Sequence, residues 1–324
     1  MVDLPGYWEE GCLALDMSES HTPILYHYLA SPYSEKLRLA LGMAGIQWGS
    51  VIVPAQPPRP FLDVFLSGYR RIPVLQIGAH FYCDSALAFD ALAGVSDRLK
   101  PAGRLSKTEE LLRRHAEDRI FFAVIAAASP ISVLRLLAQD LGLFGLFRFL
   151  KDRSDMMKGS TIEKLSQRAA ARLVEDFVEQ LNGLLKQDRF LGDAHAGYLD
   201  LCCYHPLWMA SAINRETLLA LPPLVQAWMR RIAALGHGRS VLVSERQIYD
   251  RVTGDRFQDF VGELSGAFAR DSLVSVRPTD YARDSTEGHL VFMDEHQCVI
   301  KRNLPSGDAV FLHFPISGFE VRAL

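Results

Sequence analysis

The sequence has little cysteine, and its cysteines form no recognisable framework. They are odd in number and show no C-x-x-C spacing: Cys12, Cys83, Cys202, Cys203 and Cys298. This usage is typical of a reducing compartment and does not indicate a disulfide-stapled secreted domain. The N-terminus also lacks the basic region and apolar run of a secretory signal. We therefore expect a cytoplasmic protein, in which the adjacent pair Cys202 and Cys203 packs inside a helix.

Long apolar runs are equally scarce. The most apolar window, Ile120–Leu134, contains Pro130 and is shorter than the about 20 residues that a bilayer-spanning helix needs. Arg135 then interrupts it. We expect buried helices here and no membrane span.

Neither sign of charge is in large excess, and several site motifs are missing. The chain has 35 Lys and Arg against 38 Asp and Glu, a net charge of −3, so the basic face of a nucleic-acid-binding protein is not indicated. It contains no G-x-S-x-G and no phosphate-binding loop. His296, Cys298 and His313 come nearest to a metal set, but no H-x-x-H or acidic spacing accompanies them. No metal is therefore expected.

The composition is that of a globular protein, and the predicted secondary structure changes along the chain. Its 324 residues are 49% hydrophobic and 23% charged, which is enough for two or three domains. After a tail at 1–20, strands and helices alternate over 21–98, which indicates an α/β domain. Amphipathic helical patterns fill 105–250, and short strands separated by turns fill much of 256–324. We expect an α/β domain, an all-α domain and a small antiparallel β-rich domain in that order.

One stretch of the first domain, Ser31–Leu41, carries the most informative local pattern. It follows the predicted strand 24–29 and opens a predicted helix at 34–45. Ser31 can cap that helix, and Pro32 fits its first position, where no N–H is needed. The free N–H groups and partial positive charge of a helix N-terminus can also stabilise a thiolate. From these residues alone Ser31 is either an ordinary cap or a thiolate-stabilising hydroxyl.

Three motifs of the first domain resemble those of a known family. Ser31–Leu41 reads SPYSEKLRLAL, residues 70–75 read RRIPVL, and residues 81–87 read FYCDSAL. Together and in this order they resemble the N-terminal domain of glutathione S-transferases of the serine and cysteine types, the zeta and omega classes among them. The resemblance implies a thioredoxin-like fold over 21–98, with Pro73 in cis.

The resemblance also implies a site for glutathione. Asp84 and Ser85 stand where the family binds the γ-glutamyl ammonium and carboxylate, although the family prefers Glu at the first position. Ile72 would offer its backbone to the cysteinyl unit, held by Pro73, and Arg71 matches a basic position that can pair with a carboxylate. Tyr33 follows the Ser-Pro pair and completes the implied cofactor-binding set.

Ser31 matches the family's catalytic position. Tyr28 is the first alternative, because tyrosine-type members place a hydroxyl near the end of this strand, and Ser34 is the second. A serine favours stabilisation of the glutathione thiolate over disulfide exchange. The expected chemistry is conjugation, ether cleavage or isomerisation of an electrophilic, largely apolar small molecule.

The helical domain carries two predicted capping boxes, Ser106–Glu109 and Ser160–Glu163, the second opening a helix that runs to Lys186. Between them, 121–150 is predicted to form two or more helices broken at Pro130, Gly142 and Gly145. A segment at 190–200, FLGDAHAGYLD, resembles a family motif that starts the core helix, with Gly197 in place of Ser or Thr. Further helices are expected at 198–214, 222–235 and 239–250. Suggested walls of the substrate pocket are Phe121, Phe122 and Trp208.

Residues 256–324 lie beyond the resemblance. A helix is predicted at 257–270 and strands at 273–276, 289–294, 298–302, 309–314 and 319–323. We expect an independent unit that covers the substrate side or binds a partner. This segment keeps two alternatives open: a non-catalytic binding module with this fold, and an enzyme of small-molecule metabolism acting without glutathione. Dimers are usual in the family, so a homodimer is expected.

Overall fold

A computed structural model describes residues 22–192, 194–214, 220–254, 264 and 268–324. The tail predicted at 1–20 lies outside the described residues, and so does most of the helix predicted at 257–270.

The first domain has the expected thioredoxin-like order. Its elements are β1 (Ile24–His27), α1 (Pro32–Ala44), β2 (Gln47–Ile52), α2 (Pro60–Leu66), β3 (Val74–Ile77), β4 (His80–Tyr82) and α3 (Ser85–Val95). β1 pairs in parallel with β2 and antiparallel with β3, and β3 pairs antiparallel with β4. The peptide bond between Ile72 and Pro73 is cis, as expected.

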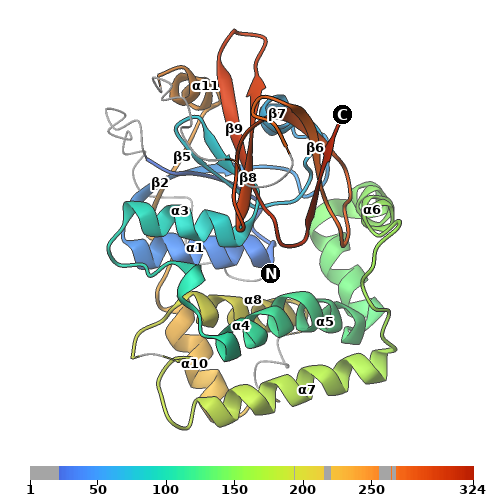
Figure 1. Cartoon of the computed structure of the whole chain (residues 1–324). Helices are drawn as coiled ribbons and strands as arrows, with labels where there is room; N and C mark the ends of the chain where they lie inside the picture. Colours follow the sequence, from blue (N-terminus) through green and yellow to red (C-terminus); the bar gives the residue numbers. More distant parts are fainter. Residues whose placement is uncertain (1–21, 193, 215–219, 255–263, 265–267) are drawn as a thin grey trace.

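An all-α domain follows. It comprises α4 (Lys107–Arg114), the π-helical turn η2 (His115–Ile120), α5 (Phe121–Ala127), α6 (Pro130–Met156), α7 (Gln167–Leu184), α8 (Tyr198–Ile213) and α10 (Pro223–Ala233), after a 3₁₀ turn η1 (Ala102–Arg104). Figure 1 shows α1 and α3 lying between the strands and the layer of α4, α5 and α8. The capping box at Ser106 forms as predicted, since Ser106 and Glu109 each accept a backbone N–H of the other.

Two predictions in this domain are wrong. Ser160–Glu163 does not open a helix, because Thr161 donates its N–H to the carbonyl of Asp280 and Glu163 pairs with Arg119; α7 begins at Gln167 with Ser166 as its cap. Pro130 does start a new helix, but α6 continues through Gly142 and Gly145. A glycine inside a helix costs only about 1 kcal/mol, which neighbouring turns can offset.

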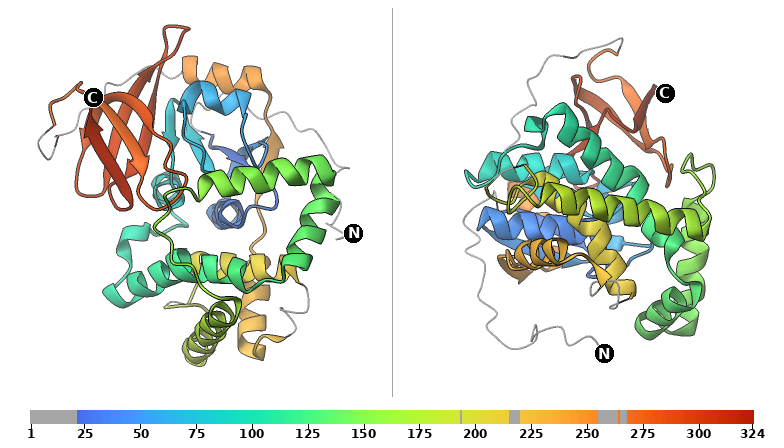
Figure 2. Two further views of the ribbon diagram at one scale, coloured as in Figure 1. Left: turned by 90° about the vertical axis from the view of Figure 1, so that its right-hand side faces the viewer. Right: turned by 90° about the horizontal axis from the view of Figure 1, so that it is seen from below.

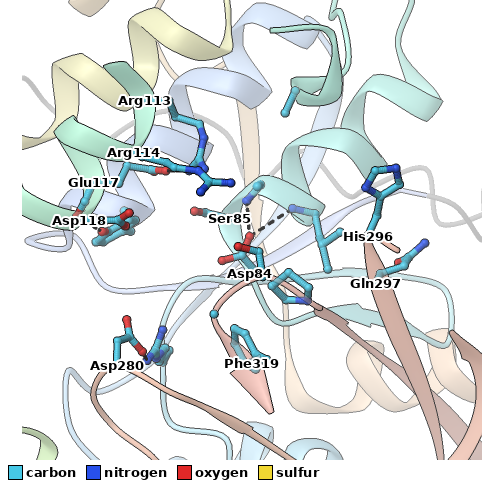
Figure 3. Close-up of a pocket in the computed structure, with 18 of the residues that line it drawn as sticks. Asp84, Ser85, Arg113, Arg114, Glu117, Asp118, Asp280, His296, Gln297 and Phe319 are labelled. Atoms are coloured by element: carbon cyan, nitrogen blue, oxygen red, sulfur yellow. Dashed lines mark hydrogen bonds and ion pairs between the residues drawn. The ribbon is translucent and has the colours of Figure 1, made fainter. Parts of the chain in front are cut away.

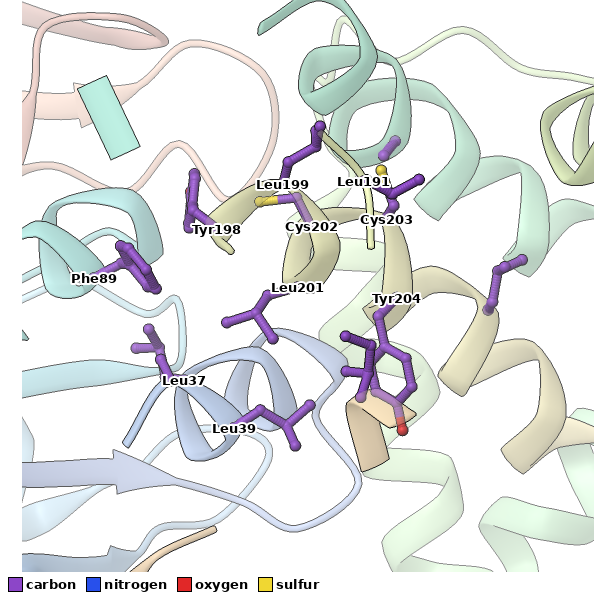
Figure 4. Close-up of a cluster of buried hydrophobic side chains, with 14 of the residues drawn as sticks. Leu37, Leu39, Phe89, Leu191, Tyr198, Leu199, Leu201, Cys202, Cys203 and Tyr204 are labelled. Atoms are coloured by element: carbon purple, nitrogen blue, oxygen red, sulfur yellow. The ribbon is translucent and has the colours of Figure 1, made fainter. Parts of the chain in front are cut away.

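The two domains share an apolar core. Helices α1 and α3 pack on α8, and Figure 4 shows Leu37, Phe89 and Leu201 converging at this interface. Cys202 and Cys203 are fully buried within α8, as their helical pattern predicted. At the start of α8 the carboxylate of Asp200 accepts hydrogen bonds from three segments: from the N–H groups of Leu191 and Gly197 and from the Trp228 indole. The helix therefore starts as the motif predicted.

The sheet grows at both edges of the first domain. At one edge β5 (Arg239–Leu242) pairs in parallel with β2, so the helix predicted over 239–250 is wrong in its first part; α11 (Glu245–Gly254) follows. Gly236 and Gly238, both with φ near +65°, end the preceding helix and turn the chain toward β2. Trp48 donates its indole N–H to the carbonyl of His237 and holds this turn in place.

At the other edge five strands extend the sheet: β6 (Leu273–Pro278), β7 (Thr286–Met293), β8 (Gln297–Asn303), β9 (Ala309–Pro315) and β10 (Phe319–Ala323). The predicted antiparallel meander is confirmed for β6 to β9. β9 then pairs in parallel with β4, which gives, among the described residues, one ten-stranded sheet in the order β10-β6-β7-β8-β9-β4-β3-β1-β2-β5. Figure 2 shows these C-terminal strands beside the first domain.

The β-rich extension is therefore not an independent unit, which corrects that expectation. Phe81 of β4 lies directly beside Leu312 of β9, and both side chains are fully buried in one apolar cluster. The same cluster contains Phe65 of α2 and Phe314 of β9. Removing the extension would expose this core and open the edge of β4.

Leu312→Ala should lower the free energy of unfolding by about 2–5 kcal/mol, the usual cost of truncating a buried leucine. The loss should appear in the urea transition followed by tryptophan fluorescence. None of the four tryptophans lies beyond residue 228, so their signal reports unfolding of the chain before the extension, and it should move only if the two parts unfold together. Leu273→Ala, at a side chain that is 44% exposed on β6, is the matched control and should change little. A tryptophan transition that does not move in Leu312→Ala would show that the extension unfolds independently.

Candidate functional site

A cavity of about 1240 Å³ lies where the first domain, the helical domain and the extension meet. Figure 3 shows Arg113, Arg114, Glu117 and Asp118 on one side, Asp84 and Ser85 in the middle, and His296 and Gln297 on the opposite side. Phe319 and Asp280 of the extension lie below them. All three parts of the chain therefore contribute walls to one cavity.

All six residues of the predicted cofactor-binding set line this cavity: Tyr33, Arg71, Ile72, Pro73, Asp84 and Ser85. They come from α1, from the segment before β3 and from the start of α3. Segments separated along the chain therefore converge on one space.

Asp84 and Ser85 occupy the N-terminus of α3. Asp84 caps the helix, and its Oδ1 accepts from Ala86 N at 2.7 Å and from Leu87 N at 3.4 Å. Ser85 follows at the first helical position, and its backbone N–H donates to no described residue. The carboxylate of Asp84 can attract a cation, while the free N–H of Ser85 and the helix dipole beside it can attract an anion. The pair suits a ligand that carries both charges.

The Ile72 peptide forms an open edge of the cavity. Within the described part of the chain, neither its N–H nor its C=O makes a hydrogen bond. A free donor and acceptor side by side can pair with an extended peptide ligand, as one strand pairs with another. This edge adjoins Arg71, so a ligand that runs along Ile72 comes within reach of the guanidinium.

Arg71 already has partners from the extension. Its Nη2 contacts the carboxylate of Asp280 and the carbonyl of Tyr281, and its guanidinium lies 4.1 Å from the centre of the Tyr281 ring. Burial opposes the charge of Arg71, but Tyr281, Tyr69 and Asp280 outweigh it and raise its pKa further above its usual value. Arg71 is therefore a charged wall of the cavity whose carboxylate partner belongs to the protein.

The predicted catalytic residue and its two alternatives do not line the cavity. Ser31 is 2% exposed, and its Oγ accepts from Ser34 N at 3.1 Å, so it caps α1. Ser34 is fully buried, and Tyr28 is half-buried outside the lining residues. Because a capping side chain turns toward the N–H groups of its own helix, the Ser31 side chain is buried. Its role in thiol chemistry stays a prediction.

The suggested pocket walls divide in the same way. Phe122 lines the cavity and packs edge-on against Tyr281, with ring centres 5.5 Å apart. Phe121 packs behind it, 4.9 Å from the Tyr33 ring, and does not line the cavity. Trp208 packs against the core between the domains.

A buried ionic cluster was missed by the sequence reasoning. Lys36 of α1, which has no exposed surface, forms an ion pair with Glu117 of η2, and Arg113 reaches the other oxygen of that carboxylate at 2.5 Å. Burial opposes ionisation of Glu117, but Lys36, His205 and Arg113 outweigh it and hold its pKa well below the usual range. Burial lowers the pKa of the nearby His205 to about 4, so this ring is neutral near pH 7.

This cluster lies between α1 of the first domain and η2 and α8 of the second. Glu117 and Arg113 also line the cavity. Glu117 sits in a π-helical turn, an irregularity that often marks functional sites. The only signal in the sequence was a Lys and a Glu in separate helical patterns, 81 positions apart, and nothing local pairs them.

The extension closes the remaining side. His313 of β9 lines the cavity and stacks on Tyr82 at 4.4 Å, and its Nε2 lies 2.9 Å from Nδ1 of His80. His296 and Gln297 belong to the turn and strand beyond β7. Among the described residues no group of three or more His, Cys, Asp or Glu is arranged to hold a metal ion. No helix in the described ranges has both the length and the apolar character to cross a membrane.

Comparisons with known proteins agree with this fold. Residues 25–94 match the family model described as the glutathione S-transferase N-terminal domain. No curated protein matches the chain. Among solved structures, a GST-like protein from Pseudomonas syringae is 24% identical, with a TM-score of 0.70 over 94% of this chain and 100% of that one. This match includes the extension, so it shows the same fold for nearly the whole chain.

More distant structures resemble only part of the chain. A beta-etherase from Sphingobium is 17% identical, with a TM-score of 0.48 over 66% of this chain and 95% of that one. A rice glutathione S-transferase solved with glutathione is 16% identical, with a TM-score of 0.44 over 73% of this chain and 97% of that one.

Lys36→Met should destabilise the protein by about 3 kcal/mol, because it leaves the buried Glu117 carboxylate with Arg113 alone, a partner shared with Glu110. Adding Glu117→Gln should restore most of the loss, since no under-compensated buried carboxylate then remains, and Arg113 keeps Glu110. Lys151→Met, which removes an exposed ion pair with Asp155, is the control and should change stability by less than about 1 kcal/mol. Urea unfolding measures all three. A single-variant loss no larger than the control's would contradict the role given to this pair.

Proposed function

We propose that this glutathione S-transferase-like chain, with its family N-terminal domain at residues 25–94, binds glutathione in the cavity and uses the thiol on an electrophilic, largely apolar small molecule. The observation that carries the proposal is the convergence of the six predicted binding residues on one cavity. A cytoplasmic location and a homodimer stay predictions.

Each end of glutathione finds a chemically suitable partner. The γ-glutamyl ammonium pairs with the Asp84 carboxylate, and the adjacent carboxylate accepts from the free N–H of Ser85 at the start of α3. The cysteinyl backbone pairs with the open peptide edge of Ile72. This arrangement directs the glycyl end toward Arg71.

The electrophile would lie against the aromatic wall of the cavity. Phe122 of α5, Tyr281 and Phe319 line the space between the helical domain and the extension. The sulfur would be held as a thiolate by a hydroxyl donor. Ser31 is the predicted donor; Tyr33 is a rival that lines the cavity and holds its hydroxyl only weakly, at 3.4 Å from the Glu117 carbonyl.

A second candidate is a binding module that holds glutathione without using its thiol. One observation favours it: Ser31 is buried as a helix cap and lies outside the residues that line the cavity. Formation of a thiolate distinguishes the two candidates.

Asp84→Asn should weaken glutathione binding about tenfold in calorimetry, because a charge-assisted hydrogen bond contributes about 1.5–3 kcal/mol. The amide still caps α3, so the fold should be kept. Asp63→Asn is the matched control: this aspartate lies in the first turn of α2, where its carboxylate accepts from Arg59 N at 2.8 Å, and it does not line the cavity. Equal affinity in the two variants would exclude Asp84 from the site.

Ser31→Ala should lower the rate with a model electrophile at neutral pH about tenfold and leave glutathione affinity nearly unchanged, because a hydrogen bond to the thiolate is lost. The rate should recover as pH rises and solvent supplies the thiolate. Tyr33→Phe tests the rival donor by the same pH profile. If ultraviolet absorbance shows no glutathione thiolate in the unmodified protein at any pH where it is folded, the binding-module candidate replaces the enzyme.

A further inference from the structure

The basic wall of the proposed glutathione site is already neutralised by the protein itself. The Asp280 carboxylate and the Tyr281 carbonyl contact Nη2 of Arg71, and the rings of Tyr281 and Phe319 lie 4.1 and 5.7 Å from its guanidinium. The Arg71 side chain is only 18% exposed, and its Nε–H is buried and donates to no described residue. The guanidinium therefore retains donors at Nε and Nη1 that no described residue takes up, but its positive charge is already paired with Asp280.

The segment that carries Asp280 is fastened to both of the other domains. This connection between β6 and β7, residues 279–285, joins the helical domain through the Asp280 carbonyl, which accepts from Thr161 N at 3.0 Å, and through Ala282 N, which donates to the Met156 carbonyl at 2.8 Å. Asp284 lies 3.5 Å from Arg70 of the first domain. A ligand would have to break several contacts to displace Asp280 from Arg71.

We propose that Asp280 excludes a second carboxylate at Arg71, so that the site selects γ-glutamylcysteinyl thiols whose far end is uncharged. This inference rests on the proposed function, because it takes the γ-glutamyl end to lie at Asp84 and Ser85 and the peptide to run along Ile72. A ligand in that position brings its far end to Arg71 and Asp280 together.

The charges there favour a neutral group. A glycyl carboxylate would meet Asp280, whose side chain is 39% exposed and already pairs with Arg71, so two carboxylates would share one cation. A carboxamide avoids this repulsion: its oxygen can accept from the guanidinium, and its N–H groups can donate to Asp280. Solvent screening makes the preference moderate, and we expect about five- to tenfold.

The test compares glutathione with glutathione amide, whose glycyl carboxylate is replaced by a carboxamide, by calorimetry on the full chain. The unmodified protein should bind the amide about five- to tenfold more tightly. Asp280→Asn frees Arg71 for a carboxylate, so it should strengthen glutathione binding by a similar factor and abolish or reverse the preference. Asp284→Asn, a neighbouring carboxylate paired with Arg70, is the matched control and should keep the preference.

Each outcome decides one point. Equal affinity for the two ligands in the unmodified protein, or tighter binding of glutathione, would overturn the selection by Asp280 and leave the proposed function standing. Binding of neither ligand by the unmodified protein or by Asp280→Asn would overturn the proposed function, and this inference with it. The comparison in the unmodified protein decides the question even if the variant fails to fold.

Discussion

The pairing of β4 with β9 is the interaction on which the rest of this structure depends. It fuses a four-stranded thioredoxin-like sheet to five C-terminal strands, and it buries Phe81 and Leu312 against each other. The register of this pair also places the connection 279–285 over Arg71 and the turn at His296 beside α3. A site that two domains would leave open on one side is thereby given a third wall.

The helical domain is held to the first domain by a different kind of contact. Around a mostly apolar interface of α1, α3 and α8, one ion pair, Lys36 with Glu117, is buried beside the cavity. Such a pair adds little to stability over apolar packing, but a mismatched arrangement would leave a charge uncompensated. The pair therefore favours the arrangement of the two domains in which both buried charges are matched.

Local signals in the sequence predicted most of the first domain and much of its site. The cap at Ser31 and the Asp84–Ser85 helix start are each set by neighbouring residues, so their motifs could be read directly. The cis bond before Pro73 was implied only by the family resemblance. The capping box at Ser160 failed because a backbone hydrogen bond to Asp280 competes with it.

The remaining features depend on partners far away along the chain. β5 forms by pairing with the edge of β2. Lys36 and Asp280 each form an ion pair with a residue of another domain. Neither composition nor periodicity carries that information. The burial of Ser31 is a further case, since the motif identifies the residue but does not say what covers it.

The large separation of β4 and β9 along the sequence has a consequence for biosynthesis. His80 and His313, which meet across this junction, are 233 positions apart, so the ribosome must make almost the whole chain before the edge of β4 finds its partner. Until then the nascent first domain presents an unpaired strand beside apolar side chains, the kind of edge that invites association with other chains. The edge of β4 thus needs protection during translation, although in the folded protein β9 covers it.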